Sequence, residues 1–137
     1  MADLLPLTGH DDDAAVEAAV AALERGELVV IPTETVYGLV ADPRVPGSVE
    51  RIYEAKQRDR GKPLQMLVSD ADVIGSMGFK LTEVEQRLAD RFWPGALTMV
   101  VAAENRSEGF RVPDLAIARD IIARVGGALR GTSANTS

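Results

Sequence analysis

Lys56-Gln57-Arg58-Asp59-Arg60-Gly61-Lys62-Pro63 leaves an amphipathic helix and enters a strand, so this stretch joins the two kinds of element that define the fold. Together with Arg51, it holds five of the fifteen Lys and Arg residues, in a chain whose formal net charge is −6. A local positive cluster on an acidic protein favours a specific anionic ligand over a general polyanion surface. The alternative is a solvated helix end, where basic residues complement the helix dipole by about 0.3–1 kcal/mol.

The length and composition describe one ordinary globular domain. The chain has 137 residues, of which 46% are hydrophobic and 26% charged. The absence of cysteine excludes disulfides, thiolate catalysis and Cys-based zinc sites. The single histidine, His10, falls in an expected N-terminal tail, which argues against His-based metal sites and triads. No apolar run approaches the roughly 20 residues that span a membrane, and we predict a cytoplasmic protein without a membrane partner.

Helical periodicity and short β-branched runs alternate along the chain, which is typical of an α/β fold. We therefore predict a single domain with a twisted mixed sheet flanked by helices. The expected helices are 11–25, 48–56, 70–77, 82–91 and 115–125, and the expected strands are 28–31, 35–40, 64–68, 97–102, 110–112 and 128–130.

Local signals predict how several of these elements begin. Ser48 and Asp114 are expected to cap the helices that follow them. Thr82 and Glu85 have the spacing of a capping box. Residues 104–109 are polar and are predicted to form a loop before the next strand.

Three further segments carry polar groups at expected strand ends, where α/β sheets bind ligands. Residues 32–39 present two hydroxyls, a carboxylate and a phenol, Arg111 stands at the end of a short strand, and 133–135 follow the last strand. Alone, these segments equally fit a Thr-rich edge, a surface arginine and a polar loop. The chain has no P-loop and no G-x-G-x-x-G motif, so a nucleotide would bind without the standard glycine cradle.

Read together, the segments resemble the YrdC-type family of threonylcarbamoyl-AMP synthases. Six strings carry the resemblance in the family's order and across almost the whole chain. They are Pro32-Thr33-Glu34-Thr35-Val36-Tyr37-Gly38-Leu39, Arg51-Ile52-Tyr53-x-x-Lys56-x-Arg58, Lys62-Pro63-Leu64, Phe92-Trp93-Pro94-Gly95-x-Leu97-Thr98, Arg111-Val112-Pro113-Asp114 and Thr132-Ser133-Ala134-Asn135-x-Ser137.

The resemblance implies an enzyme, a nucleotidyltransferase that converts L-threonine, bicarbonate and ATP into threonylcarbamoyl-AMP and pyrophosphate. The product serves threonylcarbamoylation of an adenosine in certain tRNAs, reached directly or through partner proteins. The implied fold is a twisted α/β sheet with a concave, positively charged face. Mg²⁺ would arrive with ATP, and we see no dedicated protein ligands for it and no bound prosthetic group.

The same resemblance assigns roles to individual residues. The implied catalytic residues are Lys56, Arg58, Ser133 and Asn135. The implied ATP contacts are these four together with Lys62 and Ser107. The implied threonine contacts are Thr35, Arg111, which would pair the carboxylate, and Gly131.

The chain departs from the family pattern in three places. Leu67 stands where many members have a histidine, so the threonine contacts are expected to differ, and Leu115 replaces a second histidine. Family domains also continue past the string that ends at Ser137. We therefore expect residues 1–137 to form a YrdC-like domain that lacks its C-terminal part.

Two other functions remain open on the sequence. A YrdC-like module could bind tRNA or double-stranded RNA, or assist ribosome maturation, without catalysis; the net charge of −6 and the 4% of aromatic residues argue against it. A relative could instead form a carbamoyl-adenylate from carbamoyl phosphate and pass the group to a protein thiol.

Overall fold

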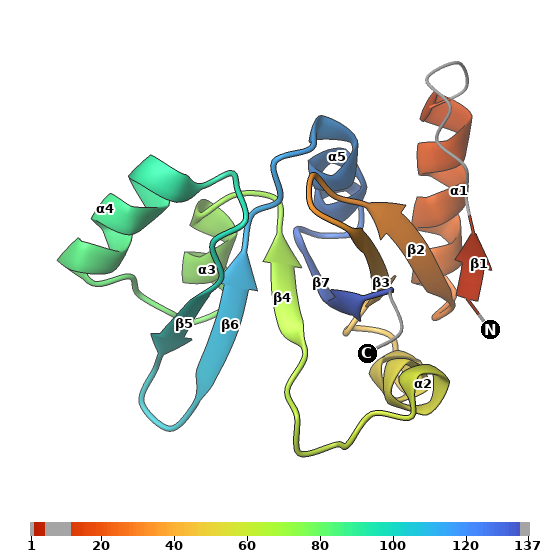
Figure 1. Cartoon of the computed structure of the whole chain (residues 1–137), viewed down its shortest axis with the longest axis horizontal. Coiled ribbons are helices and arrows are strands. Elements are labelled where there is room, and N and C mark those ends of the chain that lie inside the picture. Colours follow the sequence, from red (N-terminus) through yellow and green to blue (C-terminus); the bar gives the residue numbers. More distant parts are fainter. Residues whose placement is uncertain (1, 5–11, 135–137) are drawn as a thin grey trace.

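The computed structural model describes residues 2–4 and 12–134, and Figure 1 shows their arrangement. Its strands are β1 (Ala2–Leu4), β2 (Leu28–Pro32), β3 (Tyr37–Ala41), β4 (Gln65–Val68), β5 (Met99–Ala102), β6 (Ser107–Arg111) and β7 (Ala128–Ser133). Its helices are α1 (Asp12–Glu24), α2 (Ser48–Lys56), α3 (Asp72–Ser76), α4 (Glu83–Phe92) and α5 (Ala116–Arg124).

The described strands form one seven-stranded sheet in the order β1-β2-β3-β7-β4-β6-β5. The pairs β1–β2 and β4–β6 are parallel, and the other four pairs are antiparallel. Figure 1 shows the marked twist between the two ends of this sheet. The predicted class, a twisted mixed sheet flanked by helices, is confirmed.

Helices α1 and α5 cover one face of the sheet. Their buried residues form one core with Val29 of β2, Leu67 of β4 and Leu129 of β7. Helix α2 covers the opposite face of β2 and β3, where Ile52 is fully buried. Burial of a side chain of this size contributes roughly 1.5–3 kcal/mol.

Helices α3 and α4 pack at the other end of the sheet, on the face opposite α5. Their buried residues share a core with Met66 of β4 and Phe110 of β6. Since neighbouring residues of a strand point to opposite faces, Met66 and Leu67 show that the two groups of helices lie on opposite sides. The sheet is therefore covered by helices on alternate faces at its two ends.

This arrangement leaves part of the α5 face uncovered by helices, over β6 and the edge strand β5. Val100 of β5 lies on that part and is 68% exposed. Arg111 lies on the same face, because it pairs with Leu67 in the parallel β4–β6 ladder. The uncovered surface places polar groups of β4, β6 and β7 within reach of a ligand.

Every helix and strand expected from the sequence is present, with boundaries that shift by a few residues. The predicted loop at 104–109 is wrong in its second half, because Ser107 and Glu108 pair with β5 in a hairpin. The hairpin turn is closed by a bond from the Ala103 N–H to the Arg106 carbonyl, at 2.8 Å. Strand β7 likewise runs on to Ser133, and strand β1 was not expected.

Two of the predicted helix caps are wrong. Gly47, in a left-handed conformation with φ 83°, precedes α2, and the Ser48 hydroxyl instead donates to the Asp42 carbonyl. Leu115 precedes α5 without a side-chain cap, and the Asp114 carboxylate lies 3.6 Å from Arg119. The capping box at α4 is confirmed, with both of its bonds formed.

Candidate functional site

The stretch 56–63, here called the basic loop, is a built structure and not a loose helix end. Gln57 adopts a left-handed conformation with φ 50°, and the Arg58 N–H reaches back 2.9 Å to the Tyr53 carbonyl. This pattern of bonds closes the end of α2. The Arg58 side chain then donates to the carbonyls of Lys62 and Pro63, at 3.3 and 3.1 Å, and the Tyr53 hydroxyl donates to Lys62 at 3.0 Å.

The five neighbouring cations of the sequence make different contacts in the structure. Arg51 does not join the loop, because its guanidinium donates to the Gly26 carbonyl at 3.0 Å. Arg60 lies over the Tyr53 ring, 5.6 Å from its centre. Arg58 holds the shape of the loop by donating to the backbone carbonyls of Lys62 and Pro63. Lys62 is exposed to solvent. Lys56 is partly buried at the end of α2.

The sheet register brings the predicted serines to the point where the basic loop enters β4. Pairing of β4 with β7 and with β6 puts Ser133 and Ser107 level with Pro63, on either side of it. Strand alternation turns both side chains to the face that carries Arg111. Asn135 lies outside the described residues, so its role stays a prediction.

Arg111 is the buried charge of this face, with 6% of its surface exposed. Its Nε donates to the Gly95 carbonyl at 3.0 Å, and its Nη2 pairs with the Glu34 carboxylate at 2.5 Å. The Gly95 N–H in turn donates to the Val112 carbonyl at 2.8 Å. Arg111 thus ties the β2–β3 connection and the α4–β5 connection to the end of β6.

Glu34 is the partner that makes this burial tolerable. Removing one member of a buried ion pair costs about 3–5 kcal/mol, because the other charge stays buried and unpaired. Desolvation raises the pKa of Glu34, but the hydrogen bond and charge of Arg111, with the backbone N–H groups of Glu34 and Asp114, outweigh it and lower that pKa overall. Glu34 is therefore held as a carboxylate.

Residues 33–36, here called the Thr-rich turn, are organised by one hydroxyl. The Thr33 Oγ1 accepts from the N–H groups of Thr35 and Val36, at 3.3 and 3.2 Å, and lies 3.1 Å from the Thr35 hydroxyl. Thr35 is exposed. The turn thus presents the Thr35 hydroxyl from the same short segment that carries Glu34.

Gly131 of β7 pairs with Val40 of β3 and with Gln65 of β4. A Cβ on Gly131 would stand 2.9 Å from a Val40 methyl group and 3.4 Å from a Leu67 methyl group, so the close packing of the sheet here requires glycine. Beside it, the Thr98 hydroxyl lies 3.1 Å from the Gln65 side-chain oxygen. Gly131 is therefore packed against apolar side chains, with the Thr98–Gln65 contact at the start of β4.

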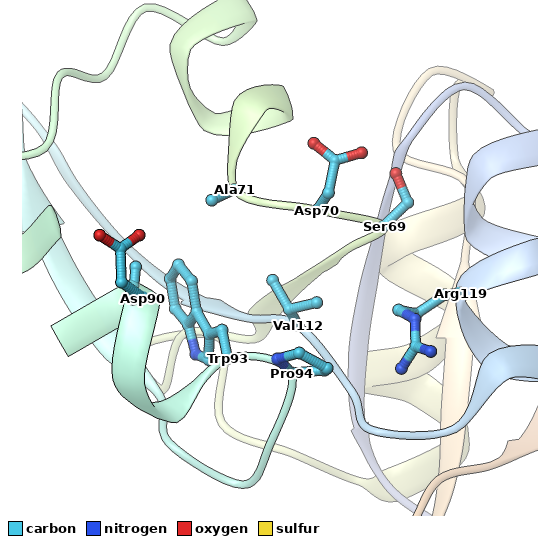
Figure 2. Close-up of a pocket in the computed structure, with 9 residues that line it drawn as sticks. Ser69, Asp70, Ala71, Asp90, Trp93, Pro94, Val112 and Arg119 are labelled. Atoms are coloured by element: carbon cyan, nitrogen blue, oxygen red, sulfur yellow. The ribbon is translucent and has the colours of Figure 1, made fainter. Parts of the chain in front are cut away.

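A separate cleft of about 380 Å³ lies beyond the ends of β4 and β6 (Figure 2). Figure 2 shows Trp93, Pro94 and Val112 at its base, with Asp90 and Arg119 on opposite sides. None of the residues predicted as site residues lines it. We place the candidate site at Arg111 and not in this cleft, because the buried Arg111 binds Glu34 of the Thr-rich turn, which also carries the predicted residue Thr35.

Comparison with known proteins now identifies the family. The Sua5/YciO/YrdC family model, described as "Telomere recombination", matches residues 21–137. The chain belongs to this family.

Curated relatives in the Sua5/YciO/YrdC family carry the name threonylcarbamoyl-AMP synthase. The chain is 34% identical to the one from Bacillus subtilis over 137 residues, which is 92% of this chain and 40% of that protein. It is 35% identical to the one from Chromohalobacter salexigens over 127 residues, covering 85% of this chain and 69% of that protein. The chain thus spans about 40% of the length of the Bacillus subtilis relative.

A solved Sua5/YciO/YrdC structure has the same fold. Sua5 from Pyrococcus abyssi, complexed with L-threonine, superposes with a TM-score of 0.84 at 28% identity, covering 100% of this chain and 42% of that one. No helix in the described part of this chain is long and apolar enough to cross a membrane.

Sequence reasoning assigned no role to two groups of the site in this family member. Glu34 and Gly95 occur only within the family strings, and neither was predicted to bind Arg111. Each binds Arg111 across the fold, Glu34 from 77 residues away, so no local pattern reports the contact. Two features of the sequence could have indicated the pair: Glu34 is the one carboxylate of the Thr-rich string, and Arg111 is the arginine at the end of β6.

Gly95→Ala should destabilise the protein, because a Cβ at Gly95 would stand 2.3 Å from the Phe92 backbone oxygen. Backbone displacement of this kind costs about 1–3 kcal/mol and would also move the carbonyl that holds Arg111. Gly38→Ala is the control, since its Cβ meets nothing closer than 3.8 Å. Urea unfolding of both variants checks this; equal losses of stability would contradict it.

Glu34→Gln should lower the free energy of unfolding at neutral pH, by less than a fully buried pair would cost, because 24% of the Glu34 side chain is exposed. The pKa of Glu34 is lower in the folded chain, so its stabilisation is complete above the ordinary pKa of about 4.3 and is lost as the pH falls through the folded value. Wild type and variant should therefore converge in urea unfolding at acidic pH. A difference that stays constant with pH would contradict this.

Proposed function

We propose that this chain carries the threonylcarbamoyl-AMP synthase reaction, in which L-threonine, bicarbonate and ATP give threonylcarbamoyl-AMP and pyrophosphate. The observation that carries the proposal is the buried Arg111 guanidinium on the α5 face of the sheet, beside the Thr-rich turn. Relatives named for this activity, and a relative solved with L-threonine, support it. The match covers 40% of the Bacillus subtilis relative, so the reaction of the whole relative is proposed for this chain and not shown for it.

In this proposal threonine binds at Arg111, next to the Thr-rich turn. Arg111 pairs its carboxylate, since a guanidinium offers two parallel donors to two oxygens. The exposed Thr35 hydroxyl contacts its polar groups. Gly131 would contact threonine through its backbone, since methyl groups of Val40 and Leu67 fill the space beside its Cα. Leu67 cannot hydrogen-bond, so the threonine hydroxyl and amine rely on other partners.

ATP would lie across the start of β4, where the basic loop meets Ser133 and Ser107. Lys56, Arg58 and Lys62 supply positive charge, and Asn135 completes the set from outside the described residues. Mg²⁺ would travel with the triphosphate; among the described residues no group of three or more His, Asp or Glu side chains is placed to hold a metal.

The chemistry asks for charge neutralisation and alignment more than for a special base. The threonine amine forms a C–N bond with the bicarbonate carbon and water leaves, giving a carbamate. A carbamate oxygen then attacks the α-phosphorus while the bond to the pyrophosphate oxygen breaks. The basic loop stabilises the charge that develops on the leaving group. Because Arg58 binds loop carbonyls, it contributes first by holding the loop's shape.

We also propose that the product serves tRNA threonylcarbamoylation in the cytoplasm, directly or through partner proteins. The alternative of a non-catalytic RNA-binding module is less favoured, because the named relatives are synthases and the net charge is −6.

Threonine-dependent pyrophosphate release from ATP and bicarbonate should test the assignment. Arg111→Lys should raise the KM for threonine, since the fork of donors is lost. A Lys56→Ala, Arg58→Ala double variant should lower kcat by on the order of 10²–10³, the usual cost of removing a donor to transition-state charge. Arg87→Ala is the control, because Arg87 is a solvent-exposed helical arginine on α4.

Two results would count against the proposed reaction. One is the absence of threonine-dependent release by the whole chain. The other is full activity in the double variant.

A further inference from the structure

The carboxylate site of Arg111 is already filled by a carboxylate of the protein itself. Glu34 pairs with Nη2, and Gly95 accepts from Nε. Only 7% of the Arg111 side chain is exposed, so the guanidinium offers little open surface to an arriving ligand. Glu34 is the outer of the two partners, with 24% of its side chain exposed.

We infer that Glu34 is an internal stand-in for the substrate carboxylate: threonine displaces Glu34 from Arg111, and the Thr-rich turn opens to admit the amino acid. This inference rests on the proposed function, because it takes threonine as the ligand. It assigns Glu34 a positioning and gating role that the reaction scheme does not include.

Charge explains why the exchange needs a carboxylate ligand. Moving Glu34 away without a replacement leaves a buried guanidinium unpaired, which is strongly unfavourable. A ligand carboxylate restores the pair, so one ion pair replaces another. A neutral analogue of threonine cannot do so, and the turn stays closed against it.

The Thr-rich turn is built to move as a unit. Thr33 holds Thr35 and Val36 through bonds within the turn, which do not depend on Arg111. Glu34 reaches outward instead, to Arg111 and the Asp114 backbone N–H. Release of Glu34 would therefore free the turn from β6 while keeping the Thr35 hydroxyl in its local geometry.

The matched control is the second Glu–Arg pair, Glu108 with Arg130, which lies on the opposite face. The Glu108 side chain is 17% exposed, close to the 24% of Glu34, while Arg130 is 24% exposed and so less buried than Arg111. Glu108→Gln thus removes a carboxylate from an arginine without touching the threonine site.

Calorimetric titration of the whole chain with L-threonine and with L-threoninamide, for wild type, Glu34→Gln and Glu108→Gln, tests the displacement. Removing the internal competitor raises the binding-competent fraction, so Glu34→Gln should bind L-threonine about tenfold more tightly. Glu108→Gln should match wild type, and L-threoninamide should bind weakly to all three. Unchanged or weaker binding of L-threonine by Glu34→Gln would overturn the inference.

A measurement on the wild-type chain does not depend on the variant folding. NMR titration of the Glu34 carboxyl carbon should show a lowered pKa without ligand and a return toward the ordinary value at saturating L-threonine. If threonine binds and the pKa of Glu34 stays lowered, the displacement is wrong while the proposed function stands. If neither wild type nor variant binds threonine, the proposed substrate and the displacement both fail.

Discussion

A guanidinium buried in a protein must keep an anion beside it, and this constraint organises the candidate site of the chain. Arg111 stands at the end of β6 and is 6% exposed. Its partners come from two distant connections, Glu34 after β2 and Gly95 after α4. The Thr-rich turn and the Trp93-Pro94-Gly95 segment are therefore held over the sheet by one side chain, and a change at any of the three alters the shape of the site.

The basic loop is held in shape by contacts among its own residues and with Tyr53. Its cations are not simply gathered to attract phosphate: Arg58 binds loop carbonyls, and Arg60 stacks on Tyr53. This internal bonding costs little when a ligand arrives, because the loop needs no reordering. The parallel pairing of β4 with β6 and the antiparallel pairing of β4 with β7 then set Ser107 and Ser133 on either side of its exit. Preorganisation of this kind is what an electrostatically driven nucleotidyl transfer requires.

Much of the fold could be predicted from the sequence, because apolar runs and helical periodicity are local. The errors have separate causes. The polar residues 104–109 hide a short hairpin in which Ser107 pairs with Ala102, and the Ser48 hydroxyl donates to the Asp42 carbonyl instead of capping α2. For the site, the family resemblance implied roles for Arg111 and Gly131, and these roles stay predictions. The Glu34–Arg111 pair could not be predicted, since 77 residues separate its members and only the folded turn brings them together.

The central claim is that Arg111 receives the threonine carboxylate while the basic loop receives the triphosphate. A crystal structure of the chain with L-threonine and a non-hydrolysable ATP analogue tests this most directly. The account predicts a threonine carboxylate on the Arg111 guanidinium, Glu34 turned away from it, and phosphates against residues 56–62. Threonine bound away from Arg111, for instance in the cleft around Trp93, would contradict it.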